Sequence, residues 1–248
     1  MYTEKLRISP VYLLIPLSVL SAVPTQLQGQ ATSGVPGYVR VPKATFNEEA
    51  TLYFGGSYLP RNYLRYTSNT YDALTVFASL TFLSFIEVDL RVSRPIGMPD
   101  ELNYYTVDRM PSVRFRILKE KKWIPAVAIG IHDVLTSVYP GGPRLFGASY
   151  LVATKNFHLT KLFLNVETTL GYGTNWWIWQ NYELVGVFGA VALRCDKVPW
   201  VSLMFDYDGE IPNAGVNLFL FKHLSITAGF LNFSSFTGSI SYQFKIKK

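Results

Sequence analysis

Hydrophobic and polar residues alternate strictly near the end of the chain. Between residues 236 and 246, apolar residues or glycine take every second position, and Thr, Ser, Gln or Lys take the positions between them. Successive residues of a β-strand point to opposite faces, so this pattern predicts a strand with one apolar and one polar face. The same alternation recurs at 85–93, 112–117, 162–172 and 201–207.

Seven further segments alternate less regularly, with Gly, Ala, Ser and Thr on the predicted inner face: 50–58, 72–82, 125–133, 145–155, 182–193, 213–221 and 224–232. Most of the twelve segments are long for strands. A tilted strand needs about 9–11 residues to cross a bilayer, whereas soluble strands average ~5–6. The pattern therefore predicts an all-β fold, a single antiparallel transmembrane β-barrel of about 12 strands.

The connections between these segments alternate in length. The long ones are 59–71, 96–109, 135–144 and 172–181, and the short ones are 83–85, 119–124, 156–160 and 194–198. The connection 208–212 is intermediate, and Lys222-His223 forms a very tight turn. Outer-membrane barrels have short periplasmic turns and longer extracellular loops. We therefore expect both termini on the periplasmic side.

Composition narrows the class further. The chain of 248 residues is 49% hydrophobic and only 16% charged, which argues against disorder and a coiled coil. After the N-terminus no apolar run is long enough for a membrane helix. A secreted β-sandwich remains the alternative, but aromatics near segment ends favour a barrel with interfacial girdles: Tyr104, Tyr105, Trp123, Tyr139, Trp176, Trp177, Trp179, Tyr182 and Trp200.

The N-terminal residues read as an export signal. Lys5 and Arg7 precede the apolar stretch Val11–Val23, and Gly29-Gln30-Ala31 supplies a small-x-small cleavage pattern. We expect residues 1–31 to be a signal peptide, with an uncleaved anchor helix as the alternative. Residues 32–49 form a Gly/Pro-rich periplasmic segment that is expected to enter the lumen as a plug, and residues 50–248 form the barrel.

Charged residues on the polar faces point to a lumenal cluster. By parity, the inner face of the third and fourth segments carries Glu87, Asp89, Arg91, Arg114 and Arg116, with Asp206 and Asp208 of the ninth segment as further candidates. An Arg facing lipid at the bilayer midplane would cost about 2–4 kcal/mol, so we expect the inward register. Two interpretations stay open: a salt-bridge ladder that pins a narrow lumen, or a constriction that selects an anionic or sugar solute.

Catalytic and metal motifs are lacking. The twelve-stranded outer-membrane phospholipase needs a His that is closely followed by a Ser-Asn-Gly run. The chain has three histidines, and residues 132–143, which read HDVLTSVYPGGP, lack that run. The single Cys195 excludes an internal disulfide and a Cys-based zinc site. The net charge of +6 is scattered rather than striped, which argues against nucleic-acid binding. We predict no catalytic residues, metal or cofactor, and keep a membrane-embedded hydrolase as a minor alternative.

Five stretches together resemble the YjbH-type outer-membrane proteins associated with exopolysaccharide operons. They cover most of the chain after the signal region: GVPGYVRVPKATF (34–46), LTFLSFIEVDLRVSR (80–94), VRFRILKEKKWIPAVAIGIHDV (113–134), GASYLVATKNF (147–157) and FDYDGEIPNAGVNLFLFKHLSITAGFLNF (205–233). Each motif is short, and the order of the motifs carries the resemblance. Where the family has Arg before Asp in the fifth strand, this chain has His132-Asp133.

The resemblance implies a non-enzymatic, porin-like outer-membrane barrel that assists exopolysaccharide export or assembly. The alternative is a sealed structural or accessory barrel that binds a partner in an envelope complex. The expected partners are outer-membrane lipid and lipopolysaccharide, and with them polysaccharide and envelope export proteins.

Overall fold

The computed structural model of the 248-residue chain describes residues 29–63, 71–97, 107–134, 147–176 and 183–246. Most of the expected signal peptide lies outside these ranges, as do six of the expected girdle aromatics: Tyr104, Tyr105, Tyr139, Trp177, Trp179 and Tyr182. Within the described ranges, no helix is long and apolar enough to cross a membrane.

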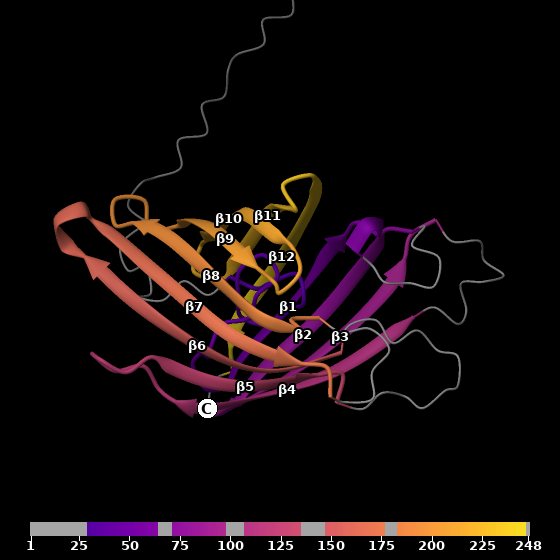
Figure 1. Cartoon of the computed structure of the whole chain (residues 1–248), viewed down its shortest axis with the longest axis horizontal. Helices are drawn as coiled ribbons and strands as arrows, with labels where there is room; N and C mark the ends of the chain where they lie inside the picture. The colour runs from indigo at the N-terminus through magenta and orange to yellow at the C-terminus, as the bar shows by residue number, and fades with distance from the viewer. Residues whose placement is uncertain (1–28, 64–70, 98–106, 135–146, 177–182, 247–248) are drawn as a thin grey trace, which may run out of the picture.

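Twelve antiparallel strands form one closed barrel (Figure 1). Every strand pairs with its neighbours in the chain, and β1 closes the barrel against β12. The strands are β1 (Thr51–Leu59), β2 (Ala73–Leu83), β3 (Ile86–Pro95), β4 (Asp108–Leu118), β5 (Ala126–His132), β6 (Ala148–Leu159), β7 (Leu164–Thr174), β8 (Gly186–Cys195), β9 (Val201–Tyr207), β10 (Pro212–Leu220), β11 (Leu224–Leu231) and β12 (Ser235–Lys245). The all-β, twelve-stranded antiparallel barrel predicted from the alternation is confirmed.

The strand boundaries differ from the sequence expectations by a few residues. For example, β4 begins at Asp108 rather than at residue 112. Pro111 interrupts the sequence pattern there, yet the strand continues through it, paired with Leu90 of β3. The tight turn expected at Lys222-His223 has Phe221 and Lys222 as its central residues, both with positive φ, and the His223 amide donates to the Leu220 carbonyl at 3.1 Å.

The two faces of the wall are as different as the alternation predicts. On β12, Phe236 and Ile240 are 52% and 53% exposed on the outside, whereas Thr237 and Ser241 on the inner face are buried. Large apolar side chains are exposed in the same way on the other strands, among them Phe54, Val76, Leu90, Leu151, Leu170, Val187, Phe205 and Phe230. The barrel is therefore apolar outside and polar inside.

The lumen is occupied by the chain itself. Residues 29–47, which we call the lumen strap, precede β1, and almost every one of them is buried. Two short bridges fold the strap on itself, Gln30 with Pro36 and Gly37 with Pro42. Asn47 is buried and Glu48 is exposed, so the strap leaves the interior just before β1 begins.

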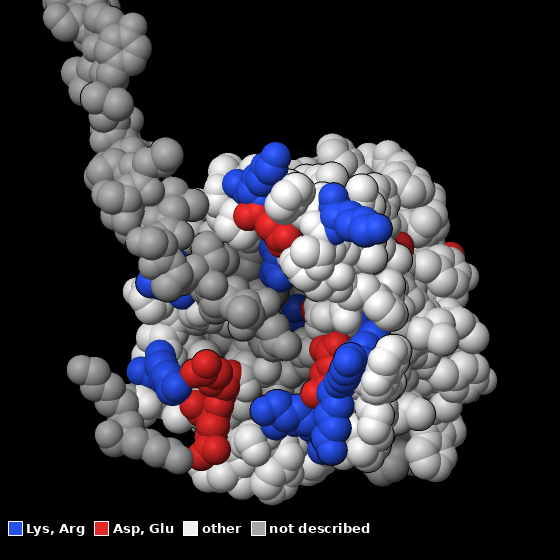
Figure 2. Space-filling model, turned by 90° about the vertical axis from the view of Figure 1, so that its left-hand side faces the viewer, with Lys and Arg blue, Asp and Glu red and all other residues white. Residues whose placement is uncertain are grey.

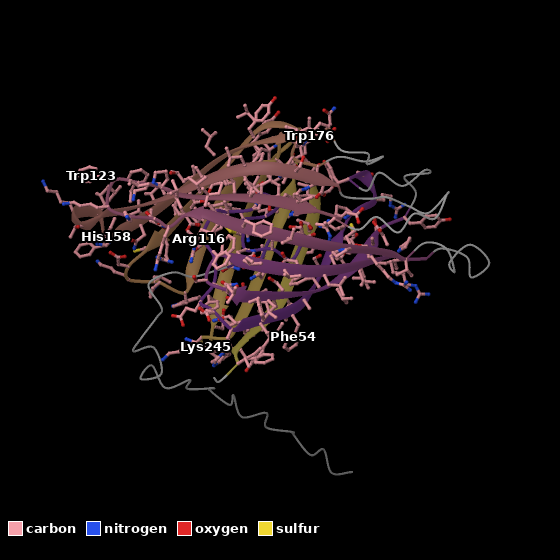
Figure 3. The ribbon with its side chains drawn as sticks, turned by 90° about the horizontal axis from the view of Figure 1, so that it is seen from below. Phe54, Arg116, Trp123, His158, Trp176 and Lys245 are labelled. Atoms are coloured by element: carbon pink, nitrogen blue, oxygen red, sulfur yellow. The ribbon has the colours of Figure 1, made fainter. Side chains whose placement is uncertain are left out.

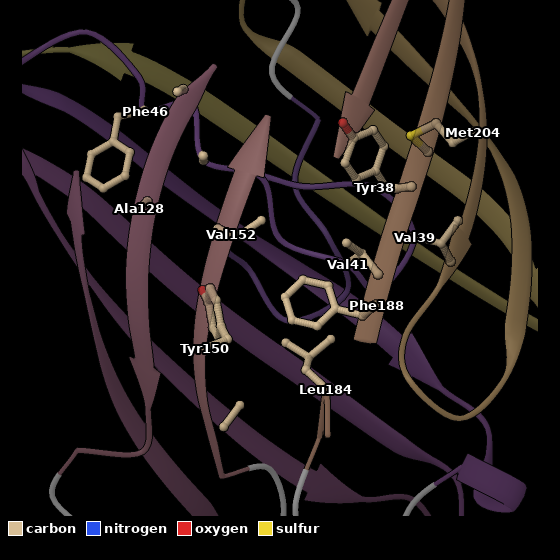
Figure 4. Close-up of a cluster of buried hydrophobic side chains, with 14 of the residues drawn as sticks. Tyr38, Val39, Val41, Phe46, Ala128, Tyr150, Val152, Leu184, Phe188 and Met204 are labelled. Carbon is tan, nitrogen blue, oxygen red and sulfur yellow. The ribbon is translucent and has the colours of Figure 1, made fainter. Parts of the chain in front are cut away.

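The buried hydrophobic cluster lies between the strap and the inner wall (Figure 4). Small residues on the inner face of β5, such as Ala126 and Ala128, leave room that the strap fills. Val39 packs where Gly215 and Gly229 face it, because a Cβ at Gly215 would lie 2.8 Å from a Val39 methyl group. A barrel of this size would otherwise enclose empty space, which protein interiors avoid.

Two short 3₁₀ helices lie at opposite ends of the barrel. Helix η2 (Arg61–Tyr63) follows β1, and η3 (Thr160–Leu162) connects β6 to β7. We call the end that carries η3 the short-turn end and the opposite end the long-connection end. The connections 60–72 and 96–107 lie at the long-connection end, and the connections 84–85 and 160–163 lie at the short-turn end. The length asymmetry seen in the sequence is therefore present in these strand connections.

Candidate functional site

One ion pair lies on neighbouring strands inside the barrel. Glu87 of β3 and Arg114 of β4 stand directly opposite each other in the ladder, and Arg114 Nη1 lies 2.6 Å from Glu87 Oε1. Both side chains are fully buried, and Thr81 Oγ1 donates to the second carboxylate oxygen at 3.1 Å. Alternation placed both residues on the inner face, and the hairpin register then sets them against each other.

Arg114 also holds the lumen strap. Its Nη2 donates to the Lys43 carbonyl, and its guanidinium lies 4.8 Å from the centre of the Phe46 ring. A cation over an aromatic face is attracted to the ring, and burial strengthens that attraction. One guanidinium therefore joins β3, β4 and the strap.

The other three members of the predicted cluster line the same part of the lumen. Asp89 and Arg91 are buried on β3, where they face Ser112 and Met110 of β4, and Arg91 Nη2 donates to Met110 Sδ at 3.4 Å. Arg116 is half-buried and lies 5.4 Å from the Phe46 ring centre. A continuous cross-strand ladder of charges does not form, because the register of β3 and β4 sets Glu87 against Arg114 but Asp89 and Arg91 against uncharged residues.

A second ionic site involves a different set of residues. Asp206 on β9 and Asp208, just beyond its end, bind the strap. Asp206 Oδ2 accepts the Arg40 amide at 2.8 Å, and Arg40 Nε lies 3.1 Å from Asp208 Oδ2. Arg40 Nη2 also lies 2.8 Å from Glu183 Oε1. Three carboxylates from β9 and the segments beside it thus surround one strap arginine.

The charge of Arg40 is stabilised by these acids. Burial by itself would lower the pKa of Arg40, but the charges of Glu183 and Asp208 raise it above its ordinary value. Sequence reasoning identified Asp206 and Asp208 as lumenal candidates but missed Arg40 and Glu183. The available signal was the pattern Val39-Arg40-Val41, in which one charge lies between two apolar residues.

Further polar contacts fix the middle of the strap. Lys43 Nζ lies 3.3 Å from Glu167 Oε1 on β7, and the Tyr38 hydroxyl lies 2.8 Å from Thr169 Oγ1. The Ala44 amide donates to Thr154 Oγ1 at 2.8 Å. Burial, aided by the charge of Glu167, raises the pKa of Tyr38 well above its usual range. The strap is therefore bonded to β4, β6, β7 and β9.

The histidines contact groups other than catalytic nucleophiles. His132 is buried at the end of β5, and its Nε2 lies 3.2 Å from the Tyr150 hydroxyl. His158 Nδ1 lies 2.8 Å from Asn165 Oδ1, and His223 Nδ1 lies 3.0 Å from the Gln243 carbonyl. Within the described ranges, no group of three or more His, Cys, Asp or Glu residues could hold a metal ion.

Charged and aromatic residues mark the ends of the barrel. Figure 2 looks onto the short-turn end, where Lys, Arg, Asp and Glu surround a hollow and the adjoining outer wall is largely free of charge. Trp123 lies at this end and Trp176 towards the opposite one (Figure 3), and they are 84% and 77% exposed. Trp200 is the last residue of the β8–β9 turn. Their positions match those expected for interfacial aromatics.

Comparison with known proteins places the chain in a family. No curated protein matches it significantly. The family model YjbH, described as "Exopolysaccharide biosynthesis protein YbjH", matches residues 29–184, from the first described residue of the strap to the segment before β8. That match spans more than half of the chain. The protein therefore belongs to the YjbH family of exopolysaccharide biosynthesis proteins.

Proposed function

We propose that the protein is an outer-membrane barrel that assists exopolysaccharide export or assembly as a sealed accessory component. The buried lumen strap is the observation that carries this proposal. An open porin-like conduit would need a water-filled interior, and here the strap fills the lumen with Tyr38, Val39 and Val41 (Figure 4). The family supports the link with exopolysaccharide.

The outer wall supports a membrane location. A closed barrel satisfies all its backbone hydrogen bonds without a free edge, as a strand-built protein in lipid must. Its outward positions carry large apolar side chains that are about half exposed, such as Phe54, Leu170 and Phe205. In water such a surface would be an aggregation hazard. In the outer membrane it would contact lipid and lipopolysaccharide.

A sealed lumen changes how the barrel would act. Growing polymer would not pass through this barrel, so the ends and the connections become the working surfaces. The charged rim at the short-turn end (Figure 2) would face the periplasm in the proposed orientation. That rim is where envelope export proteins would dock.

Deletion of the gene tests the link with exopolysaccharide. We expect surface and secreted polysaccharide to fall, and a plasmid copy of the wild-type gene to restore them. Unchanged polysaccharide in the deletion strain, under conditions where the wild type produces it, would remove this role.

Planar bilayer recordings test the sealed lumen. We expect the wild-type protein to give no steady conductance, and a variant lacking residues 29–46 to give discrete steps. Heat-modifiable migration on SDS gels would first establish that both proteins are folded. Steady ohmic conductance from the folded wild type would favour a porin-like channel.

A further inference from the structure

We infer that the signal peptide is cut before Gly29, so that Gly29, Gln30 and Ala31 remain in the mature protein as part of the lumen strap. This inference rests on the proposed export of the chain. It moves the processing site away from the Gly29-Gln30-Ala31 pattern that the sequence alone favours.

The first observation is that these three residues are integrated into the fold. All three are buried, with Gln30 and Ala31 exposed by no more than 1%. The Gly29 carbonyl accepts the Gly37 amide at 3.0 Å, and the Gln30 carbonyl accepts Ser239 Oγ of β12 at 3.2 Å. Ala31 closes a tight turn, since its amide donates to Val35 and its carbonyl accepts Gly34.

A cut after Ala31 would remove all of these contacts. The Gly37 amide and the Ser239 hydroxyl would lose their partners inside the barrel. Buried polar groups in native proteins are nearly always hydrogen-bonded, and an unsatisfied one is destabilising. The bridge between Gln30 and Pro36 would also be lost, and with it one of the two bridges that shape the strap.

The same cut would create a charge in the interior. The new terminus would be the amino group of Thr32, a residue that is 3% exposed. Its nitrogen now donates to the Val39 carbonyl at 3.0 Å, and its carbonyl accepts Ser57 Oγ at 2.6 Å. The partner of this nitrogen is an uncharged carbonyl, so an ammonium group inside the barrel at this position would have no counter-ion, which is unfavourable.

Two further observations agree with an upstream cut. A Cβ at Gly29 would lie 3.0 Å from Asn217 Cγ, so the chain already runs close to β10 at this residue. The match to the YjbH family begins at residue 29 and so includes the three residues that a cut after Ala31 would remove. Upstream of Gly29, at the end of the apolar stretch, Ser21 and Ala22 are small residues of the kind that signal peptidase accepts.

The direct test is the N-terminal sequence of the full-length protein purified from outer membranes. Labelling of the free amino terminus, followed by digestion and mass spectrometry, identifies the first residue. A first residue from 22 to 29 supports the inference. A first residue at Gln30 or beyond overturns it, although export to the outer membrane would stand. An uncut chain beginning at Met1 overturns both the inference and the proposed signal peptide.

A processing assay that does not depend on folding provides the second test. If the cut came after Ala31, signal peptidase would require a small residue at position 31, and Ala31→Leu places a bulky one there. Ala44→Leu is the matched control in the same buried strap. We expect the ratio of precursor to mature protein after a short pulse to stay within twofold of wild type in both. A tenfold accumulation of precursor in Ala31→Leu alone would overturn the inference.

Discussion

The two ionic sites in the lumen bury similar charges but are built differently. Glu87 and Arg114 come from adjacent strands of one hairpin and are fully enclosed. Arg40 comes from the strap and meets Asp206, Asp208 and Glu183, which are more than 140 residues away along the chain, and its side chain keeps 14% exposure. The first site therefore joins two strands of the wall and also contacts the strap, whereas the second attaches the strap to the wall.

The difference has an energetic consequence. Removing one partner of a fully buried ion pair leaves the other charge without a counter-ion and without water. The free energy of unfolding then falls by about 3–5 kcal/mol. At the Arg40 site the remaining carboxylates keep other partners: Asn213 donates to Asp206 at 2.7 Å, the Ile211 amide donates to Asp208 at 2.9 Å, and the Glu183 side chain is 15% exposed. Damage at the wall site should unfold the barrel, whereas damage at the strap site should release the strap from an intact barrel.

The largest effect is expected for Arg114→Met. The substitution leaves Glu87 buried without its guanidinium and removes the contact with the Lys43 carbonyl. We expect the free energy of unfolding to fall by about 3–5 kcal/mol, measured by urea titration in detergent. The double variant Glu87→Gln/Arg114→Met is the control, and it should recover much of that loss. An equally large loss of unfolding free energy in the double variant would show that the unpaired charge of Glu87 is not the cause.

Arg40→Met should release the strap with a smaller loss of stability. Hydrogen bonds to charged groups contribute about 1.5–3 kcal/mol each, and the wall does not depend on this arginine. We expect the barrel to remain heat-modifiable while trypsin gains access to the bond after Lys43, which is 2% exposed in the intact protein. A barrel that unfolds fully, with no intermediate cleaved at Lys43, would show that the two sites are not separable.

Arg116→Met should have a modest effect. This residue is half-buried and contacts the Phe46 ring at 5.4 Å, and cation–π contacts at partly exposed sites contribute about 0.5–1 kcal/mol. Urea titration should therefore give a loss of no more than about 1 kcal/mol, with no new trypsin cleavage in the strap. A loss as large as that of Arg114→Met would mean that Arg116 belongs to the wall site.

The smallest effect is a pH dependence at the short-turn end. Burial alone would raise the pKa of Glu120 in the β4–β5 turn, but hydrogen bonds from Asn156 and the Lys155 ammonium hold it below its ordinary value. Because the pKa of Glu120 is lower in the folded protein than in the unfolded chain, the ionised carboxylate stabilises the turn at any pH above the unfolded-state pKa. This stabilisation is lost as the pH falls through the folded-state pKa and the carboxylate is protonated. Amide exchange at Asn156, whose amide donates to Glu120 at 2.9 Å, should accelerate in acid.

Glu120→Gln is the control for this pH dependence. Its amide exchange at Asn156 should be faster than wild type at neutral pH and should lose the acid-induced step. A wild-type protein whose exchange at Asn156 follows only the intrinsic chemical rate through this pH range would contradict the assignment.

The local sequence pattern was sufficient to predict many of the wall strands and which of their residues face outward. The alternation of residues 236–246 predicted both the strand β12 and its outward face, because successive side chains of a strand must point to opposite sides. Parity also predicted that Glu87 and Arg114 share the inner face, and the direct pairing of β3 with β4 sets them opposite each other. At Pro111 the pattern failed, because a proline counts against a central strand.

The arrangement of the lumen depended on tertiary structure. The sequence by itself determined an all-β chain with one apolar face, and it identified the Gly/Pro-rich segment that precedes the first strand. Only the closed barrel decided that Arg40 meets Asp206 and Asp208 and that Gln30 lies against Ser239. Alternation is a property of neighbouring residues, whereas these contacts join segments that approach only after β1 pairs with β12. The width and twist of the barrel determine which strand each strap residue contacts. Neither property can be predicted from the local sequence pattern.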